Sequence, residues 1–215
     1  MFMIQFSKGN KILFISPHTD DMELGCGGTV SRLLEENAEI YSLAMSKCQI
    51  SVPSNYSENI LEIEYANSCR SLGIDGNKTF ILDYPVREFP EHRQSILQKF
   101  VDIRKTISPD IVFVPCSNDI HQDHNTVHME ATRAFKNTNL IGYELPWNNF
   151  KMINNFYVKL SEKNIQDKIN ALSHYRSQGF RNYTSDKFVR SLAIVRGIQG
   201  GAEFCESFEL IKTII

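Results

Sequence analysis

The sequence predicts an α/β fold with one mainly parallel sheet and helices on both faces. Short apolar runs alternate with stretches in which apolar residues recur every three or four positions. This alternation is typical of strands connected by helices. Two of the runs end at a proline followed by a polar loop, at Pro17 and at Pro115. Strands that alternate with helices pair in parallel through right-handed crossovers, so we expect a doubly wound, Rossmann-like sheet.

The individual elements follow from residue 12 onward. The run at 12–15 is short, apolar and followed by Ser-Pro, as expected of a buried parallel strand. Two helical stripes have clear ends, one at Gly73 and one at Ser108-Pro109. The predicted strands are 12–15, 39–45, 79–82, 110–114, 140–144 and 155–160; the predicted helices are 28–37, 61–72, 96–107 and 123–135, and the last part of the chain is predicted to be helical, with stripes at Ile165, Ile169 and Leu172 and at Phe188, Leu192 and Val195.

Composition restricts the class of protein. A chain of 215 residues that is 42% hydrophobic can bury one substantial core, and because it contains no linker or repeat we expect one domain over 1–215. The formal net charge of −2 gives no general electrostatic reason to expect nucleic acid or an anionic membrane as a partner. Five cysteines without a CxxC pair favour reduced thiols. No apolar stretch reaches the about 18 residues of a membrane span, and the N-terminus does not resemble a secretory signal, so we expect a cytoplasmic protein.

Ionisable residues follow two of the predicted strands. His18, Asp20 and Asp21 come after the first strand, and the segment with His121 and His124 follows the strand at 110–114. In open α/β sheets, ligands bind beyond the carboxyl ends of the strands. Two histidines and one carboxylate from separate loops form a typical open site for a divalent metal. We predict that His18, Asp21 and His124 are its ligands.

The remaining side chains of these loops suggest catalytic roles. Asp20 is adjacent to Asp21 and cannot easily share its direction, so it is a candidate general base for an attacking water. His121 could, when protonated, stabilise an oxyanion or protonate a leaving amine. Asp123 could orient and charge-stabilise the imidazole of His121. The same residues also permit a non-heme Fe(II) oxygenase with a facial triad, or a sugar-binding module without catalytic activity. A lone Asp-Asp pair is usually a solvated turn, and the glycines at 25, 27 and 28 fit helix packing better than dinucleotide binding.

Two longer motifs carry a resemblance to a known family. Residues 17–29 read PHTDDMELGCGGT, and residues 121–124 read HQDH. The sequence resembles the LmbE-like, or PIG-L, family of zinc-dependent N-deacetylases. Weaker similarities lie at 174–178, 202–203 and 206–208, so the resemblance spans almost the whole chain. It implies the same roles: His18, Asp21 and His124 as ligands of Zn²⁺, or of another divalent metal such as Fe²⁺, Asp20 as base, and His121 supported by Asp123.

The resemblance also implies a substrate class, namely an N-acyl, typically N-acetyl, group on a small-molecule amino sugar or sugar conjugate. Two positions depart from the family pattern. Thr19 replaces a common proline, and an arginine that many members carry near the helix start is absent at 59–61. Substrate contacts are expected from Arg87 or Arg176, and from Tyr84 or Trp147 by stacking. The glycan, the acyl group and the metal stay open; the oligomeric state also stays open, and a homo-oligomer is compatible with the sequence.

Overall fold

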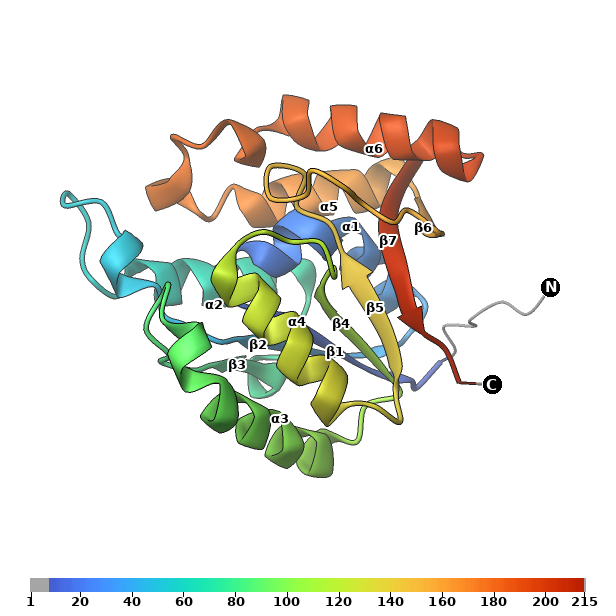
Figure 1. Cartoon of the computed structure of the whole chain (residues 1–215). Helices are drawn as coiled ribbons and strands as arrows, with labels where there is room; N and C mark the ends of the chain where they lie inside the picture. The colour runs from blue at the N-terminus through green and yellow to red at the C-terminus, as the bar shows by residue number, and fades with distance from the viewer. Residues whose placement is uncertain (1–7, 215) are drawn as a thin grey trace.

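The computed structural model describes residues 8–214, which form a seven-stranded sheet in the order β3-β2-β1-β4-β5-β7-β6 (Figure 1). Strands β3, β2, β1, β4 and β5 pair in parallel, whereas β7 is antiparallel to both of its neighbours. The strands are β1 (Lys11–Ser16), β2 (Glu39–Ala44), β3 (Thr79–Ile81), β4 (Ile111–Pro115), β5 (Asn139–Tyr143), β6 (Phe156–Leu160) and β7 (Phe204–Lys212). The predicted fold class is confirmed.

Helices cover both faces of this sheet. They are α1 (Asp21–Glu35), α2 (Ile60–Leu72), α3 (Arg93–Ile107), α4 (Gln122–Ala134), α5 (Glu162–Leu172) and α6 (Asp186–Gly200). Alternate side chains of β1 enter two separate cores: Leu13 and Ile15 pack with α3 and α4, and Ile12 and Phe14 pack on the face that α1, α2, α5 and α6 cover (Figure 1). This alternation is what a strand buried on both faces requires.

The strand order places a switch point between β1 and β4. The chain runs from β1 outward through β2 to β3, and then returns to the other side of β1 to form β4 and β5. The loops that leave the carboxyl ends of β1 and β4 therefore diverge, which opens a crevice at the edge of the sheet. These are the two loops in which the sequence concentrates histidine and aspartate.

Three of the predicted elements differ from the structure. The last part of the chain is not all helical, because β7 inserts between β5 and β6. Its pattern is hard to recognise because Glu206 and Glu209 are buried within it, each accepting hydrogen bonds from backbone N–H groups. The buried face of α6 is Val189, Ala193 and Gly197 rather than the predicted stripe, and Val195 is 49% exposed.

The third difference concerns α1, which begins at Asp21 and not at residue 28. The glycines at 25, 27 and 28 lie inside the helix, where they allow neighbouring elements to approach. A Cβ on Gly25 would lie 2.6 Å from the Tyr143 ring, and one on Gly27 would lie 2.8 Å from Cγ of Lys168. The glycines therefore serve close packing of α1, and the helix delivers Asp21 directly to the crevice.

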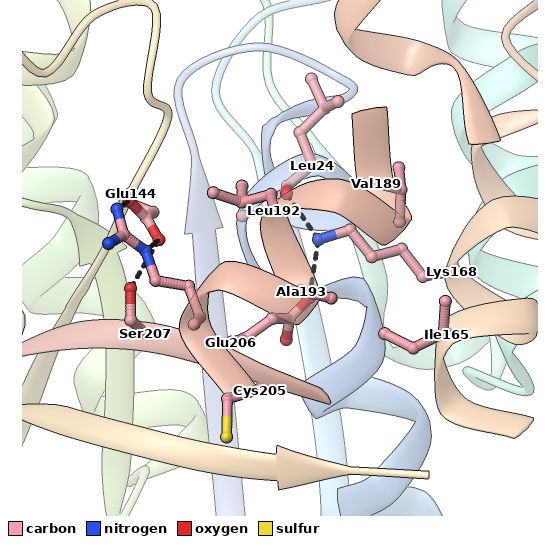
Figure 2. A pocket seen from close by; sticks show the side chains of 12 residues that line it. Leu24, Glu144, Ile165, Lys168, Val189, Leu192, Ala193, Cys205, Glu206 and Ser207 are labelled. Atoms are coloured by element: carbon pink, nitrogen blue, oxygen red, sulfur yellow. Dashed lines mark hydrogen bonds and ion pairs between the residues drawn. The ribbon is translucent and has the colours of Figure 1, made fainter. Parts of the chain in front are cut away.

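A buried ion pair between Lys168 of α5 and Glu206 of β7 holds this helix in place. Lys168 Nζ donates to the carbonyl of Leu24 and to Oε1 of Glu206, both at 2.7 Å (Figure 2). The Glu206 carboxylate also accepts the N–H groups of Gly28 and Thr29, at 3.0 and 2.7 Å. Side chains from α5 and β7 thus bind the backbone of α1 directly, which holds the start of α1 in a defined position.

Within residues 8–214, no helix has the length and apolar character needed to cross a lipid bilayer.

Candidate metal centre

Three predicted ligand atoms meet beyond the ends of β1 and β4. Nδ1 of His18 lies 3.1 Å from Nε2 of His124, and Oδ2 of Asp21 lies 3.4 Å from each of these nitrogens. Four ligands arranged tetrahedrally at ~2.0–2.1 Å from Zn²⁺ are separated by about 3.3 Å from one another. The triangle formed by His18, Asp21 and His124 has these dimensions, so its donor set fits a divalent cation.

A carboxylate lies behind each of the two histidines. Oδ2 of Asp123 is 3.1 Å from Nε2 of His18, and Oδ2 of Asp119 is 2.8 Å from Nδ1 of His124. A proton on these outer nitrogens would leave Nδ1 of His18 and Nε2 of His124 with free lone pairs that point to Asp21. Metal-binding histidines commonly have this arrangement, because the outer carboxylate fixes the tautomer and makes the ligand more basic.

A second group of donors overlaps with the first. His18, His121 and His124 each offer one nitrogen, and these nitrogens lie within 4.8 Å of one another. Three histidines could therefore also hold a metal. We favour the set with Asp21, because its separations of 3.1–3.4 Å match a single coordination sphere more closely.

Local backbone structure explains why these side chains converge. Asp21, the first residue of α1, accepts the N–H of His18 at 2.7 Å and so closes the loop after β1. After β4, Asp119 accepts the N–H of His121 at 2.9 Å, while His121 caps α4 by accepting the N–H of Asp123 through Nδ1. Each loop is thus tied by side chains that also belong to the site.

The two adjacent aspartates differ in their electrostatics. Burial, followed by the charge of Asp21, raises the pKa of Asp20 to about 6. Burial also opposes ionisation of Asp21, but His124 and His18 together hold the pKa of that carboxyl well below its usual range. Asp21 is therefore permanently ionised at neutral pH, whereas Asp20 can gain and lose a proton.

The structure shows the surroundings of His121 and Asp123, whose catalytic roles stay predictions. Burial, with a contribution from His124 and His18, lowers the pKa of His121 to about 4, so the imidazole is neutral at pH 7 rather than protonated. Its Nδ1 accepts a backbone N–H, so its proton resides on Nε2. The Asp123 carboxylate contacts His18 and the N–H groups of Arg87 and Phe89.

The candidate metal centre lies in a cavity of about 290 Å³. Trp147 and Arg87, two of the four predicted substrate contacts, line it. Tyr84 does not, because it packs against Phe89 with ring centroids 6.0 Å apart, and Arg176 lines a neighbouring hollow instead.

Several cavity residues were not identified from the sequence. Tyr183 stacks on Trp147 with centroids 3.9 Å apart and rings 11° from parallel, and Gln178 and Arg181 stand beside it. Gln178, Arg181 and Tyr183 follow α5, so they lie far along the chain from the loops after β1 and β4. Asp119 was also missed, although its place five residues before His124 in the same loop could have indicated it.

A family model matches the part of the chain that contains the loops after β1 and β4. Residues 13–135, more than half of the chain, match the PIG-L family, described as GlcNAc-PI de-N-acetylase. The chain belongs to the PIG-L family. The match includes all three predicted metal ligands, and the predicted family resemblance is confirmed.

Individual relatives cover most of the chain. The uncharacterized deacetylase YaiS of Escherichia coli K12 is 25% identical over 179 residues, which are 80% of this chain and 93% of that protein. The diacetylchitobiose deacetylase of Thermococcus kodakarensis is 22% identical, over 97% of this chain and 86% of its own length. The crystal structure of the conserved protein TT1542 from Thermus thermophilus superposes with a TM-score of 0.78 at 26% identity, covering 95% of each chain.

Proposed function

We propose that the protein is a metal-dependent hydrolase that removes an N-acyl group, in the first instance N-acetyl, from an amino sugar or sugar conjugate. The observation that carries this proposal is the triangle of His18, Asp21 and His124 with Asp20 beside it in the cavity. Relatives named as deacetylases, including one named for diacetylchitobiose, support the choice of an amide of an amino sugar.

The metal would be held by Nδ1 of His18, Oδ2 of Asp21 and Nε2 of His124. A divalent cation bound there supplies Lewis-acid polarisation of the amide carbonyl and lowers the pKa of a nearby water molecule. Asp123 and Asp119 keep the two imidazoles in the tautomers that leave these nitrogens free.

Asp20 is proposed to move the proton in the reaction. As a carboxylate it accepts a proton from the attacking water, whose oxygen forms the new bond to the amide carbon. When the carbon–nitrogen bond breaks, the carboxyl group of Asp20 returns that proton to the departing amine. A pKa of about 6 suits both directions of transfer near neutral pH.

His121 is proposed to act as a neutral hydrogen-bond donor. Its Nε2–H is available because Nδ1 already accepts the N–H of Asp123. A donor fixed at the N-terminus of α4 needs no reorganisation when negative charge develops on the carbonyl oxygen, which lowers the energy of the transition state.

The proposed sugar site is the part of the cavity wall that Trp147 and Tyr183 form. The stacked rings of Trp147 and Tyr183 offer an apolar face with a polar hydroxyl at one end. Sugars bind to such faces through their C–H surfaces while their hydroxyls reach polar groups at the rim.

Acetate release from N-acetyl sugars, both free and nucleotide-linked, tests the proposal. We expect turnover by the metal-loaded protein and loss of turnover in Asp20→Asn, in which metal content should remain normal. Normal turnover of that variant would refute the role of Asp20. Retained metal with no hydrolysis of any N-acyl sugar would instead indicate a binding module, and metal-dependent oxygen consumption would indicate an oxygenase.

A further inference from the structure

Tyr175 lies behind the loop that carries the proposed base. Tyr175 and Thr19 are each only 1% exposed, and the Tyr175 hydroxyl donates to the carbonyl oxygen of Thr19 at 2.6 Å. That carbonyl belongs to the peptide group that joins Thr19 to Asp20. The same hydroxyl lies 3.2 Å from Oε1 of Glu23, but it has a single proton, and the shorter contact assigns that proton to Thr19.

The carbonyl of Thr19 depends on this bond because it lies just outside α1. The first bond of the helix runs from the N–H of Leu24 to the carbonyl of Asp20, at 3.0 Å. An N-cap residue is the first whose carbonyl enters the helical ladder, so the carbonyl before it needs a donor from elsewhere. Without the Tyr175 hydroxyl this buried carbonyl would lose its hydrogen bond, and the peptide group before Asp20 would lose a restraint.

The direction of the Asp20 side chain depends on the same peptide group. Asp20 is the N-cap residue of α1, but its carboxylate makes no capping hydrogen bond. The carboxylate accepts a hydrogen bond from its own backbone N–H, which lies in the peptide group that Tyr175 holds. The proposed metal ligands have other supports: Asp21 accepts the N–H of His18 at 2.7 Å, and Asp123 lies 3.1 Å from Nε2 of His18.

A second side chain holds the other side of Thr19. Burial raises the pKa of the Cys48 thiol, and a hydrogen bond from the N–H of Thr19 opposes this rise. The same thiol donates to the carbonyl of Ser46, with sulfur and oxygen 3.6 Å apart. Thr19 is thus tied by its N–H to the loop after β2 and by its carbonyl to the segment after α5.

The segment that carries Tyr175 is itself anchored. Ser177 donates its N–H and its hydroxyl to the two carboxylate oxygens of Glu64 in α2, at 2.9 and 2.6 Å. Both residues are buried, so this double contact takes the place of water for the carboxylate. The segment at 174–178, one of the weaker sequence similarities to the family, therefore binds α2 and brings a hydroxyl against the loop after β1.

We propose that Tyr175 is a positioning residue: its hydroxyl, with the Cys48 thiol on the other side of Thr19, holds the peptide group that sets the direction of the Asp20 carboxylate. This inference rests on the proposed function, because Asp20 is the proposed base. Since Tyr175 acts through Asp20, it contributes to the rate of the chemical step and not to the affinity for the sugar or the cation.

Tyr175→Phe removes the hydroxyl and keeps the ring. We expect kcat for acetate release from N-acetyl sugars to fall about 10- to 100-fold, since a small misplacement of a reacting group costs up to about 100-fold. KM and the affinity for Zn²⁺ should change by less than about 2-fold, because only an interaction that acts in the transition state is lost.

Tyr65→Phe is the matched control. Tyr65 is also 1% exposed, and its hydroxyl also donates to a backbone carbonyl, that of Phe80 at 3.1 Å. This variant should lose a comparable buried hydrogen bond and leave kcat unchanged. Cys48→Ala frees the N–H of Thr19 in a protein that keeps Tyr175, and it should lower kcat by about 3- to 10-fold.

Hydrogen exchange followed by mass spectrometry gives a readout that does not need the reaction. The amide protons of residues 18–21 should exchange about 10-fold faster in Tyr175→Phe than in the wild type or in Tyr65→Phe, because the loop after β1 opens more often.

An unchanged kcat in Tyr175→Phe would overturn the proposal, and so would an unchanged exchange rate at 18–21. A fall in kcat that Tyr65→Phe matches, or that accompanies a loss of zinc, would also overturn it, because the hydroxyl would then only stabilise the fold. Absence of acetate release by the zinc-loaded wild type would instead refute the proposed function, and the exchange rates would still show whether Tyr175 holds the loop.

Discussion

Replacing Lys168 with methionine removes one partner of the ion pair that binds the backbone of α1. The ammonium and the Glu206 carboxylate lie 2.7 Å apart with side chains only 6% and 7% exposed. Methionine keeps much of the apolar stem but leaves the carboxylate without its cation and the carbonyl of Leu24 without its donor. Glu206 retains the N–H groups of Gly28 and Thr29.

The expected loss of unfolding free energy is about 3–5 kcal/mol, because breaking a buried pair leaves an uncompensated buried charge. A chain of this size loses about 2–4 °C of Tm for each kcal/mol, so the Tm should fall by about 6–20 °C. Exposed ion pairs should behave differently: Arg190→Met breaks contacts whose carboxylates are 60–61% exposed, and should lower the free energy of unfolding far less than Lys168→Met does.

Urea unfolding followed by circular dichroism measures the free energy of unfolding of both variants. A double variant tests whether the uncompensated charge of Glu206 causes the loss. If the left-over charge is responsible, Lys168→Met combined with Glu206→Gln should be more stable than Lys168→Met alone. A Lys168→Met protein that loses less than about 1 kcal/mol, or a double variant that is less stable still, would refute the reasoning.

Three further changes test other parts of the account. Asp119→Asn should weaken metal affinity about 10- to 100-fold by removing the charge behind His124, and an unchanged affinity in a chelator competition would contradict the tautomer argument. Burial first, with a smaller contribution from Asp20, raises the pKa of Glu23 from 4.5 to about 8. Between these two pH values the folded protein keeps the proton on Glu23, whereas the unfolded chain has lost it. The free energy of unfolding of the wild type should therefore fall, relative to that of Glu23→Gln, by about 1.4 kcal/mol for each unit by which the pH rises in this range. Parallel stability curves of the two proteins would contradict that burial effect. Trp147→Ala should raise KM for N-acetyl sugars about 10-fold with little change in kcat, and an unchanged KM would remove the stacked pair from the sugar site.

Most of the sheet could be predicted because its central parallel strands are buried on both faces. Such strands are short apolar runs, and β1 and β4 stand out for that reason. β7 could not be recognised in the same way, since Glu206 and Glu209 interrupt its apolar pattern. Their burial is compensated by backbone donors from elements far away in the sequence, which local periodicity cannot reveal.

The start of α1 illustrates a related limit. Glycines usually end or interrupt helices, so the sequence predicts a turn where the helix has already begun. The glycines are needed because Tyr143 and Lys168 approach the helix from β5 and α5, and tertiary packing overrides the local preference.

The site could be predicted where its chemistry is local. The adjacent aspartates and the spaced histidines could be assigned to the ends of two predicted strands. In the structure these strands, β1 and β4, are neighbours, so the two groups of side chains meet. Which ring nitrogen faces which carboxylate depends on the orientation of each ring, so the contact of Asp123 with His18 could not be predicted from the sequence. Arg181 and Tyr183 belong to the segment after α5, and no local sequence pattern indicates that this segment lies beside the loops after β1 and β4.

The central claim is that the centre formed by His18, Asp21 and His124 hydrolyses an N-acyl sugar through a bound divalent metal. The most direct test is acetate release by protein stripped of metal with a chelator and then titrated with Zn²⁺ or Fe²⁺. We predict a loss of about 100-fold or more on stripping and full recovery at one metal ion per chain, with no recovery in His124→Ala. Undiminished acetate release by the stripped protein, or full recovery in that variant, would contradict the account.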